Sequence, residues 1–213
     1  MSEQLAFDLP SRPALERDDF LIAAPNADAV AWLDRWPDWP GQCLCIHGPE
    51  GCGKSHLIEV WRRRSGARDF AAFAGRMAEG AVALDDADRQ QDETALFHAI
   101  NAVREQGGSL LLTARSAPAR WPVSLPDLRS RLAALPAVAV GPPDDALLAA
   151  LLVKQFRDRQ LQVPMEVVDY LLRRLERTFA AVRRAVTALD AASLRARRPI
   201  TVPLARRVLD ELS

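Results

Sequence analysis

The sequence predicts an α/β fold, a parallel five-stranded sheet with helices on both faces, followed by a small all-α lid domain. Two observations predict it. Short runs that are apolar at nearly every position alternate with helical patterns from Gly41 to Val140, as in parallel sheets buried on both faces. After Gly141-Pro142-Pro143 only helical patterns remain. We therefore expect three parts: a flexible tail over residues 1–19, an α/β domain over 20–143 and a helical lid domain over 144–213.

The strands and helices follow from these two patterns. The expected strands are Cys43–Ile46, Asp69–Phe73, Ala81–Leu84, Leu110–Leu112 and Ala137–Val140, of which the second is weak. The helices expected in the α/β domain are 29–33, His56–Arg64, Asp92–Gln106 and Leu125–Leu132. Four more are expected in the lid domain, beginning near Asp144, Pro164, Phe179 and Thr201.

Composition excludes several classes of protein. The 213 residues are 49% hydrophobic, which excludes a wholly disordered chain. No run approaches about 20 apolar residues, so we expect no membrane span and no membrane partner. The acidic N-terminus does not have the pattern of a secretory signal. Three cysteines, an odd number, argue against a disulfide framework and favour a reduced, cytoplasmic location.

One glycine-rich loop carries the strongest chemical signal. The motif G-x-x-x-x-G-K-[ST] is matched between an expected strand and an expected helix, which is the context that this motif requires. Glycines let backbone N–H groups wrap around phosphates, the lysine reaches the β and γ phosphates, and the serine can ligate Mg²⁺. Lysine occurs only at positions 54 and 154 of this arginine-rich chain. The predicted nucleotide-binding residues are Gly48, Pro49, Glu50, Gly51, Cys52, Gly53, Lys54, Ser55 and His56.

Two acidic residues end the strand Ala81–Leu84. Because the carboxyl ends of parallel strands share one edge of the sheet, Asp85 and Asp86 are expected beside the phosphate loop. Asp85 would then hold Mg²⁺ together with Ser55, and Asp86 would activate water. The alternative is that these carboxylates only solvate the start of a loop.

Two other groups of residues have a functional and a structural interpretation. Cys43, Cys45 and His47 share one strand face, but residues two apart on a strand lie about 6.6 Å apart, too far to converge on one metal ion without bending. Buried thiols are the favoured interpretation. Trp32, Trp36 and Trp39 are expected to pack against the protein, with stacking on a nucleotide base as the alternative.

Together these features resemble the AAA+ family, its DnaA branch, and within that branch the Hda-type regulatory inactivators. Residues Phe20–Asn26 resemble the adenine-side segment of the family, and residues 144–213 its lid. Leu125–Leu132 resembles the arginine-finger segment, which places the finger, a catalytic residue, on Arg131. The alternative for Arg131 is an ion pair within the chain.

The tail resembles the sliding-clamp-binding peptide of the same inactivators. Such a peptide pairs a glutamine with spaced apolar side chains that can enter a groove. The residues that match are Gln4, Leu5, Phe7 and Leu9.

The resemblance implies a regulator of chromosome replication initiation. It would bind ADP or ATP with Mg²⁺, dock on the sliding clamp (the beta subunit of DNA polymerase III) and stimulate ATP hydrolysis by DnaA. Its own ATPase would be weak or absent, DNA contact would be indirect, and a homodimer is allowed. The alternatives are an autonomous AAA+ ATPase, a clamp-loader-like factor or a DNA-binding replication factor.

Two departures from the family's pattern affect the expected chemistry. The register places Ala180 where the lid's sensor arginine belongs, with Arg183 and Arg184 one turn later. Arg115 stands at the acidic sensor position after the strand Leu110–Leu112. We therefore expect nucleotide hydrolysis and nucleotide discrimination to differ from those of the family.

Overall fold

The computed structural model describes residues 21–73 and 80–212. Within these ranges the chain forms two compact units, residues 24–141 and residues 142–212. The tail that carries Gln4, Leu5, Phe7 and Leu9 lies outside the described residues. No helix of the described ranges is long and apolar enough to cross a membrane.

The first unit is built on a parallel sheet of five strands. In chain order they are β1 (Cys43–His47), β2 (Arg68–Asp69), β3 (Ala81–Leu84), β4 (Ser109–Ala114) and β5 (Ala137–Ala139). Their spatial order is β2-β3-β4-β1-β5, and every neighbouring pair is parallel. The central strand β1 therefore has β4 on one side and β5 on the other, and all five carboxyl ends meet at one edge. This confirms the predicted α/β class.

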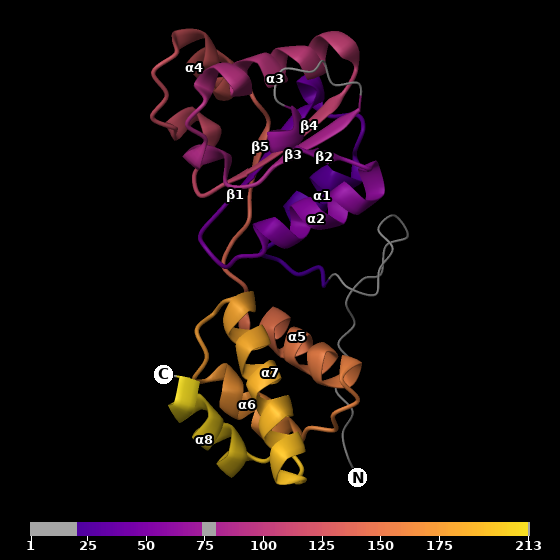
Figure 1. Ribbon diagram of the computed structural model, residues 1–213, viewed down its shortest axis with the longest axis vertical. Coiled ribbons are helices and arrows are strands. Elements are labelled where there is room, and N and C mark those ends of the chain that lie inside the picture. Colours follow the sequence, from indigo (N-terminus) through magenta and orange to yellow (C-terminus); the bar gives the residue numbers. More distant parts are fainter. Residues whose placement is uncertain (1–20, 74–79, 213) are drawn as a thin grey trace. The chain divides into compact units, whose positions relative to one another are not determined.

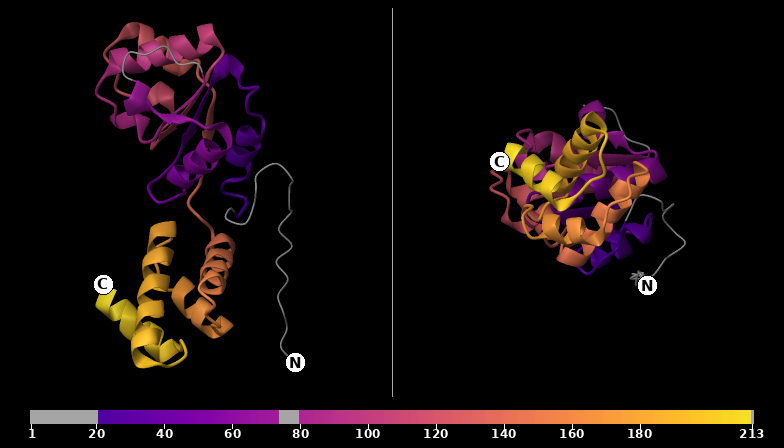
Figure 2. Two further views of the ribbon diagram at one scale, coloured as in Figure 1. Left: turned by 45° about the vertical axis from the view of Figure 1, so that its right-hand side comes forward. Right: turned by 90° about the horizontal axis from the view of Figure 1, so that it is seen from below.

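Helices cover both faces of this sheet. They are α1 (Ala27–Asp34), α2 (Lys54–Ser65), α3 (Glu93–Gln106) and α4 (Pro126–Ala133). Figures 1 and 2 show α1 and α2 on one side of the sheet and α3 and α4 on the other. Alternate strand residues serve the two faces, so Cys45 and Leu112 share a core with Leu96 of α3 and Leu128 of α4.

Two expected strands differ from the structure. Asp69–Phe73 was expected as a strand, but β2 ends at Asp69 and Phe70–Phe73 is a 3₁₀ turn. The Asp69 carboxylate accepts a hydrogen bond from the Ala71 backbone N–H at 3.1 Å, a local turn that competes with strand pairing. Strand β5 ends at Ala139, one residue before the predicted end, and only one of its faces is buried, because Val138 is buried whereas Ala137 and Ala139 are exposed.

The second unit is a bundle of four helices. They are α5 (Asp145–Asp158), α6 (Met165–Leu172), α7 (Phe179–Ala196) and α8 (Val202–Leu212) (Figure 1). Asp144 caps α5 by accepting from the Leu147 N–H at 2.8 Å, and Thr178 caps α7 in the same way. The bundle has its own apolar core, which includes Leu152, Phe156, Val168 and Leu189.

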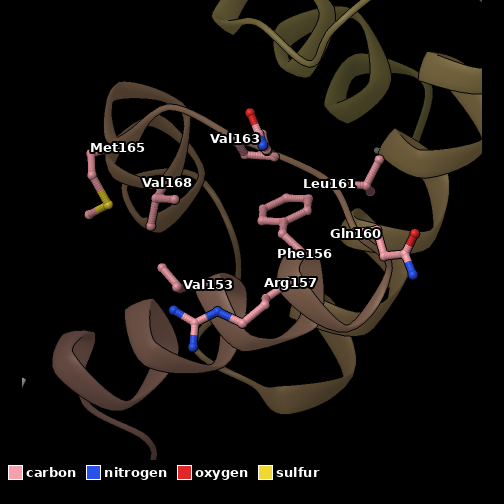
Figure 3. Close-up of a pocket in the computed structure, with 9 residues that line it drawn as sticks. Val153, Phe156, Arg157, Gln160, Leu161, Val163, Met165 and Val168 are labelled. Carbon is pink, nitrogen blue, oxygen red and sulfur yellow. The ribbon is translucent and has the colours of Figure 1, made fainter.

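A pocket of about 400 Å³ opens in this bundle between α5 and α6. Figure 3 shows Phe156 at its centre, with Val153 and Val168 on one side and Leu161 on the other. Arg157 and Gln160 lie at its border. None of the candidate functional residues that the sequence predicts lines this pocket.

The tryptophans pack against the protein, as the sequence favoured. Trp39 stacks on Trp61 of α2 with ring centroids 5.3 Å apart, and Trp36 meets the same ring edge-on at 6.1 Å. The indole N–H of Trp36 donates to Ser109 Oγ at 3.0 Å, at the start of β4. This cluster therefore lies at the amino edge of the sheet, whereas the glycine loop leaves the carboxyl edge. The base-stacking alternative is wrong for Trp36 and Trp39.

Candidate functional site

The glycine loop joins β1 to α2 and is fixed by close contacts with both strands beside β1. The Gly48 N–H donates to the Ala114 carbonyl of β4 at 3.1 Å. A Cβ atom at Gly48 would lie only 2.1 Å from the Val140 carbonyl oxygen, just beyond β5, and 3.1 Å from Cys52 Sγ. Gly53, with φ of 100°, turns the chain into α2. Glycine is therefore required at position 48 by the approach of two backbones.

Lys54 lies inside the loop that precedes it. Its side chain belongs to the first residue of α2 and is only 7% exposed. The ammonium Nζ donates to the carbonyls of Gly48 and Pro49, both at 2.9 Å. Because these acceptors are neutral, the positive charge is held in place without being cancelled.

The amino end of α2 has the chemistry of an anion site. Its N-cap is Gly53, which supplies no side-chain acceptor to the first-turn N–H groups. Those donors, the helix dipole and the Lys54 ammonium all favour a negative charge at the loop. Ser55 and His56 are exposed in the same turn. The residues present thus fit a phosphate group, with a hydroxyl beside it that can ligate a cation.

The two acidic residues lie at the same edge, after β3. The hydroxyl of Thr113, a fully buried residue of β4, donates to the Asp85 carboxylate and accepts from the Asp86 N–H, the latter at 3.0 Å. Asp85 is exposed, and the half-buried Asp86 carboxylate pairs with Arg89 at 3.5 Å. Thr113 thereby fixes the position of both acids.

Sequence reasoning missed Thr113. Its signal was a hydroxyl near the carboxyl end of an apolar strand whose other hydroxyl, Ser109, lies at the opposite end. A polar residue that is fully buried at such an edge needs a partner, and a carboxylate is the one within reach.

Arg115 bridges the acidic segment and the loop. Its backbone N–H donates to Asp88 at 3.0 Å, and its guanidinium meets the Glu50 carboxylate at 2.7 Å. Both ends of the ion pair are exposed, so solvent screens it. The sequence placed Arg115 at this edge, but its pairing with a loop residue was not foreseen.

The segment proposed for the adenine side reaches the same edge. Within its described part, the Pro25 carbonyl accepts from the Gly141 N–H at 3.0 Å, just after β5. Asn26 is buried and occupies the N-cap position of α1. Residues 25 and 26 therefore lie against the chain that borders Gly48.

The cysteines behave as buried structural thiols. Burial raises the pKa of Cys43 to about 12, and burial together with the charge of Asp88 raises the pKa of Cys45 to about 12. Burial and the nearby Arg120 lower the pKa of His47. Among the residues described, no group of three metal-ligating side chains gathers that could hold an ion. A thiolate metal site on this strand face is therefore not formed.

Arg131 lies in the last turn of α4 and its side chain is exposed. Leu128 and Leu132 face the core and fix the rotation of the helix, which leaves Arg131 on its flank. Across the described ranges, no acidic side chain forms an ion pair with Arg131. Within these ranges the alternative of an internal pair is therefore not observed, and the Arg131 side chain is exposed.

The lid positions of interest lie near the start of α7. Ala180, Arg183 and Arg184 are all exposed, and Arg184 pairs with Glu176 at 3.8 Å. Arg177, just before the helix, pairs with Asp145 at 3.1 Å.

Comparisons with known proteins agree with this architecture. Residues 144–209 match the family model described as Hda, lid domain. The chromosomal replication initiator protein DnaA of Thermomicrobium roseum is 27% identical over 232 aligned positions, which cover 93% of this chain and 50% of that protein. The chain thus spans about half the length of this curated relative.

Solved structures show the same fold. Domain III of Thermotoga maritima DnaA superposes with a TM-score of 0.76 at 18% identity, covering 95% of this chain and 98% of that one. AMPPCP-bound DnaA from Aquifex aeolicus superposes with a TM-score of 0.68 at 17% identity, covering 86% and 67%. Together with the lid match and the DnaA relative, these likenesses support an Hda/DnaA-related AAA+ protein.

Proposed function

We propose that this protein regulates chromosome replication initiation by presenting Arg131 to ATP held by DnaA. The observation that carries the proposal is the exposed guanidinium of Arg131 on α4 of a DnaA-like α/β unit, joined to an Hda-type lid. A guanidinium supplied in trans neutralises charge on a transferring phosphoryl group and raises its rate by roughly 10³–10⁵-fold. DnaA converted to its ADP form would then cease to initiate.

The glycine loop binds ADP or ATP in this proposal. Lys54 faces the phosphates, while Ser55 and Asp85 hold Mg²⁺, which neutralises phosphate charge when bound. Support comes from the anion-fitting end of α2, from the Thr113 hydroxyl that orients Asp85, and from the related fold of AMPPCP-bound DnaA. Residues 48–53 and His56 shape the loop around this ligand.

Asp86 is the proposed water-activating acid for any turnover by the chain itself. Its carboxylate is held by Arg89 at 3.5 Å, and its N–H by Thr113. Intrinsic turnover of the isolated chain, measured with and without Asp86→Asn, separates a regulator from an autonomous ATPase. Fast turnover that Asp86→Asn abolishes would favour the ATPase.

The tail supplies the proposed clamp contact. Gln4 and the apolar Leu5, Phe7 and Leu9 would enter a groove of the sliding clamp, so that the regulator acts where the clamp is loaded on DNA. Gln4→Ala or Leu5→Ala should abolish retention of the clamp on a size-exclusion column and leave the fold intact. Unchanged retention would remove this part of the proposal.

The decisive experiment measures stimulation of DnaA ATP hydrolysis with clamp and DNA present. Arg131→Ala should remove most of the stimulation, of which a finger in trans supplies roughly 10³–10⁵-fold, and should leave nucleotide binding by this chain nearly unchanged. Arg129→Ala, on another face of α4, should lose less. If Arg131→Ala stimulated DnaA ATP hydrolysis fully, the proposal that Arg131 acts in trans would be wrong.

A further inference from the structure

The amino end of α4 has no side chain of its own to cap it. Its N-cap is Leu125, which supplies no side-chain acceptor, and its first residue is Pro126. The N–H groups of Ser124 and Leu125 precede the first helical residue, so they have no partner within the helix and need acceptors elsewhere. They find them on another helix. The Glu93 carboxylate accepts from the Ser124 N–H at 2.8 and 3.0 Å and from the Leu125 N–H at 2.7 Å. One side chain of α3 therefore holds the entry to α4.

Glu93 is available for this contact because α3 has a separate cap. Asp92 is the N-cap of α3 and accepts from the Ala95 N–H at 2.8 Å. Hydrogen bonds from the Ser124 and Leu125 N–H groups lower the pKa of Glu93, so the carboxylate is charged at neutral pH. Charged acceptors form the stronger class of hydrogen bond.

The apolar contact between α3 and α4 still allows α4 to slide or tilt on α3, and the hydrogen bonds of Glu93 restrict that movement. Leu128 and Leu132 are fully buried beside Leu96 of α3, which fixes how α4 is rotated. Side chains of this kind tolerate sliding and tilting better than directed hydrogen bonds do. Arg129, whose guanidinium donates to the Val123 carbonyl at 2.6 Å, braces the same segment from α4 itself.

We propose that Glu93 is a positioning residue for Arg131: its carboxylate fixes the amino end of α4 on α3 and so holds the arginine in reach of a partner's phosphate. This inference rests on the proposed function of Arg131. The guanidinium must lie within a fraction of an ångström of its productive place to stabilise a transition state, so a loosened helix loses rate.

The test compares three variants by two measurements. Glu93→Ala removes all three hydrogen bonds, Glu93→Gln keeps a neutral acceptor, and Asp127→Asn removes an exposed charge from the first turn of α4 without touching the contact. The first measurement is hydrogen exchange of the Ser124 and Leu125 amides. The second is maximal stimulation of DnaA ATP hydrolysis at a saturating concentration of the variant.

Glu93→Ala should speed exchange of the two amides by about tenfold or more, the effect of losing hydrogen bonds to a charged group. It should lower maximal stimulation by a similar factor and leave this chain's affinity for nucleotide unchanged. Glu93→Gln should show smaller changes than Glu93→Ala in both amide exchange and maximal stimulation. Asp127→Asn should give the values of the unmodified chain in both measurements. Partial rescue by Glu93→Gln separates positioning from general loss of fold.

Two results overturn the inference: unchanged amide exchange in Glu93→Ala, or faster exchange with full stimulation. The Arg131→Ala variant tests the proposed function independently of the Glu93 variants. If that variant keeps full stimulation, the finger is abandoned, and with it the claim that Glu93 serves a finger.

Discussion

The glycine loop and α4 carry the two proposed functional charges, and they are held in place differently. The Lys54 charge is held within the loop's own motif, because its ammonium donates to the carbonyls of Gly48 and Pro49. The entry to α4 is fixed from 31 and 32 residues away, by Glu93 of α3. Contacts within a motif can be recognised in the sequence by its spacing. A contact between residues far apart in the sequence cannot, and Glu93 has no feature in the sequence that marks its role.

The largest effect is expected for Gly48→Ala, which tests whether the loop depends on backbone approach. A Cβ only 2.1 Å from the Val140 carbonyl oxygen cannot be accommodated without moving the loop. Nucleotide affinity, measured by calorimetry, should fall by at least about a hundredfold, or 2.7 kcal/mol.

Gly66→Ala is the matched control for this prediction. Gly66 has a positive φ of 66°, and a Cβ there would meet nothing within 4 Å. It should cost about 1 kcal/mol of stability and leave nucleotide affinity unchanged. Equal affinities for the two alanine variants would show that the approach to Val140 is unimportant.

Lys54→Ala is expected to have the next largest effect, because it removes the charge and the two hydrogen bonds from the ammonium to the loop carbonyls. Nucleotide affinity should fall by more than tenfold, or about 1.4 kcal/mol, in the same calorimetric titration. Lys154→Ala removes the other lysine, which lies in the lid and pairs with Asp158 at 2.9 Å. Binding by Lys54→Ala as tight as by Lys154→Ala would refute the site.

The same distinction between local and distant contacts decides which features the sequence predicts. Apolar runs and helical spacing predicted four of the five strands and the eight α-helices of the described ranges, because each pattern is local. Asp69–Phe73 failed because a side-chain turn at Asp69 outcompeted pairing at the end of a two-residue strand. At the site, the motif predicted the loop and the acids, but not the residues that orient them. The contacts of Thr113 and Glu93 depend on which strands and helices become neighbours, and no spacing encodes that.

Thr113→Val tests one of these distant contacts and should have a moderate effect. Valine has nearly the same shape, but it leaves the Asp86 N–H and the Asp85 carboxylate without their shared partner. Chemical denaturation should show a loss of about 1–3 kcal/mol, and Mg²⁺-dependent nucleotide affinity should weaken. Thr113→Ser retains the hydroxyl and should lose less. Equal stability of the two variants would count against the orienting role.

The smallest effect is expected from an electrostatic interaction between the strand that precedes the glycine loop and the segment that precedes α4. His47 ends β1 just before the loop, and Arg120 belongs to the 3₁₀ turn (Pro118–Arg120) that precedes α4. Burial and the Arg120 charge lower the pKa of His47 in the folded chain. The unfolded chain therefore takes up a proton near pH 6.5 that the folded chain resists, so the free energy of unfolding decreases as pH falls through that value.

The change between pH 7.5 and 5.5 should be well below the ~1.4 kcal/mol of one full pKa unit, because solvent screens the partly exposed imidazole. Denaturation midpoints across this range should be flatter for His47→Gln than for the unmodified chain. Arg120→Gln should flatten them less, since burial of His47 remains as the larger cause. If His47→Gln keeps the whole pH dependence, the two regions are not coupled through this pair.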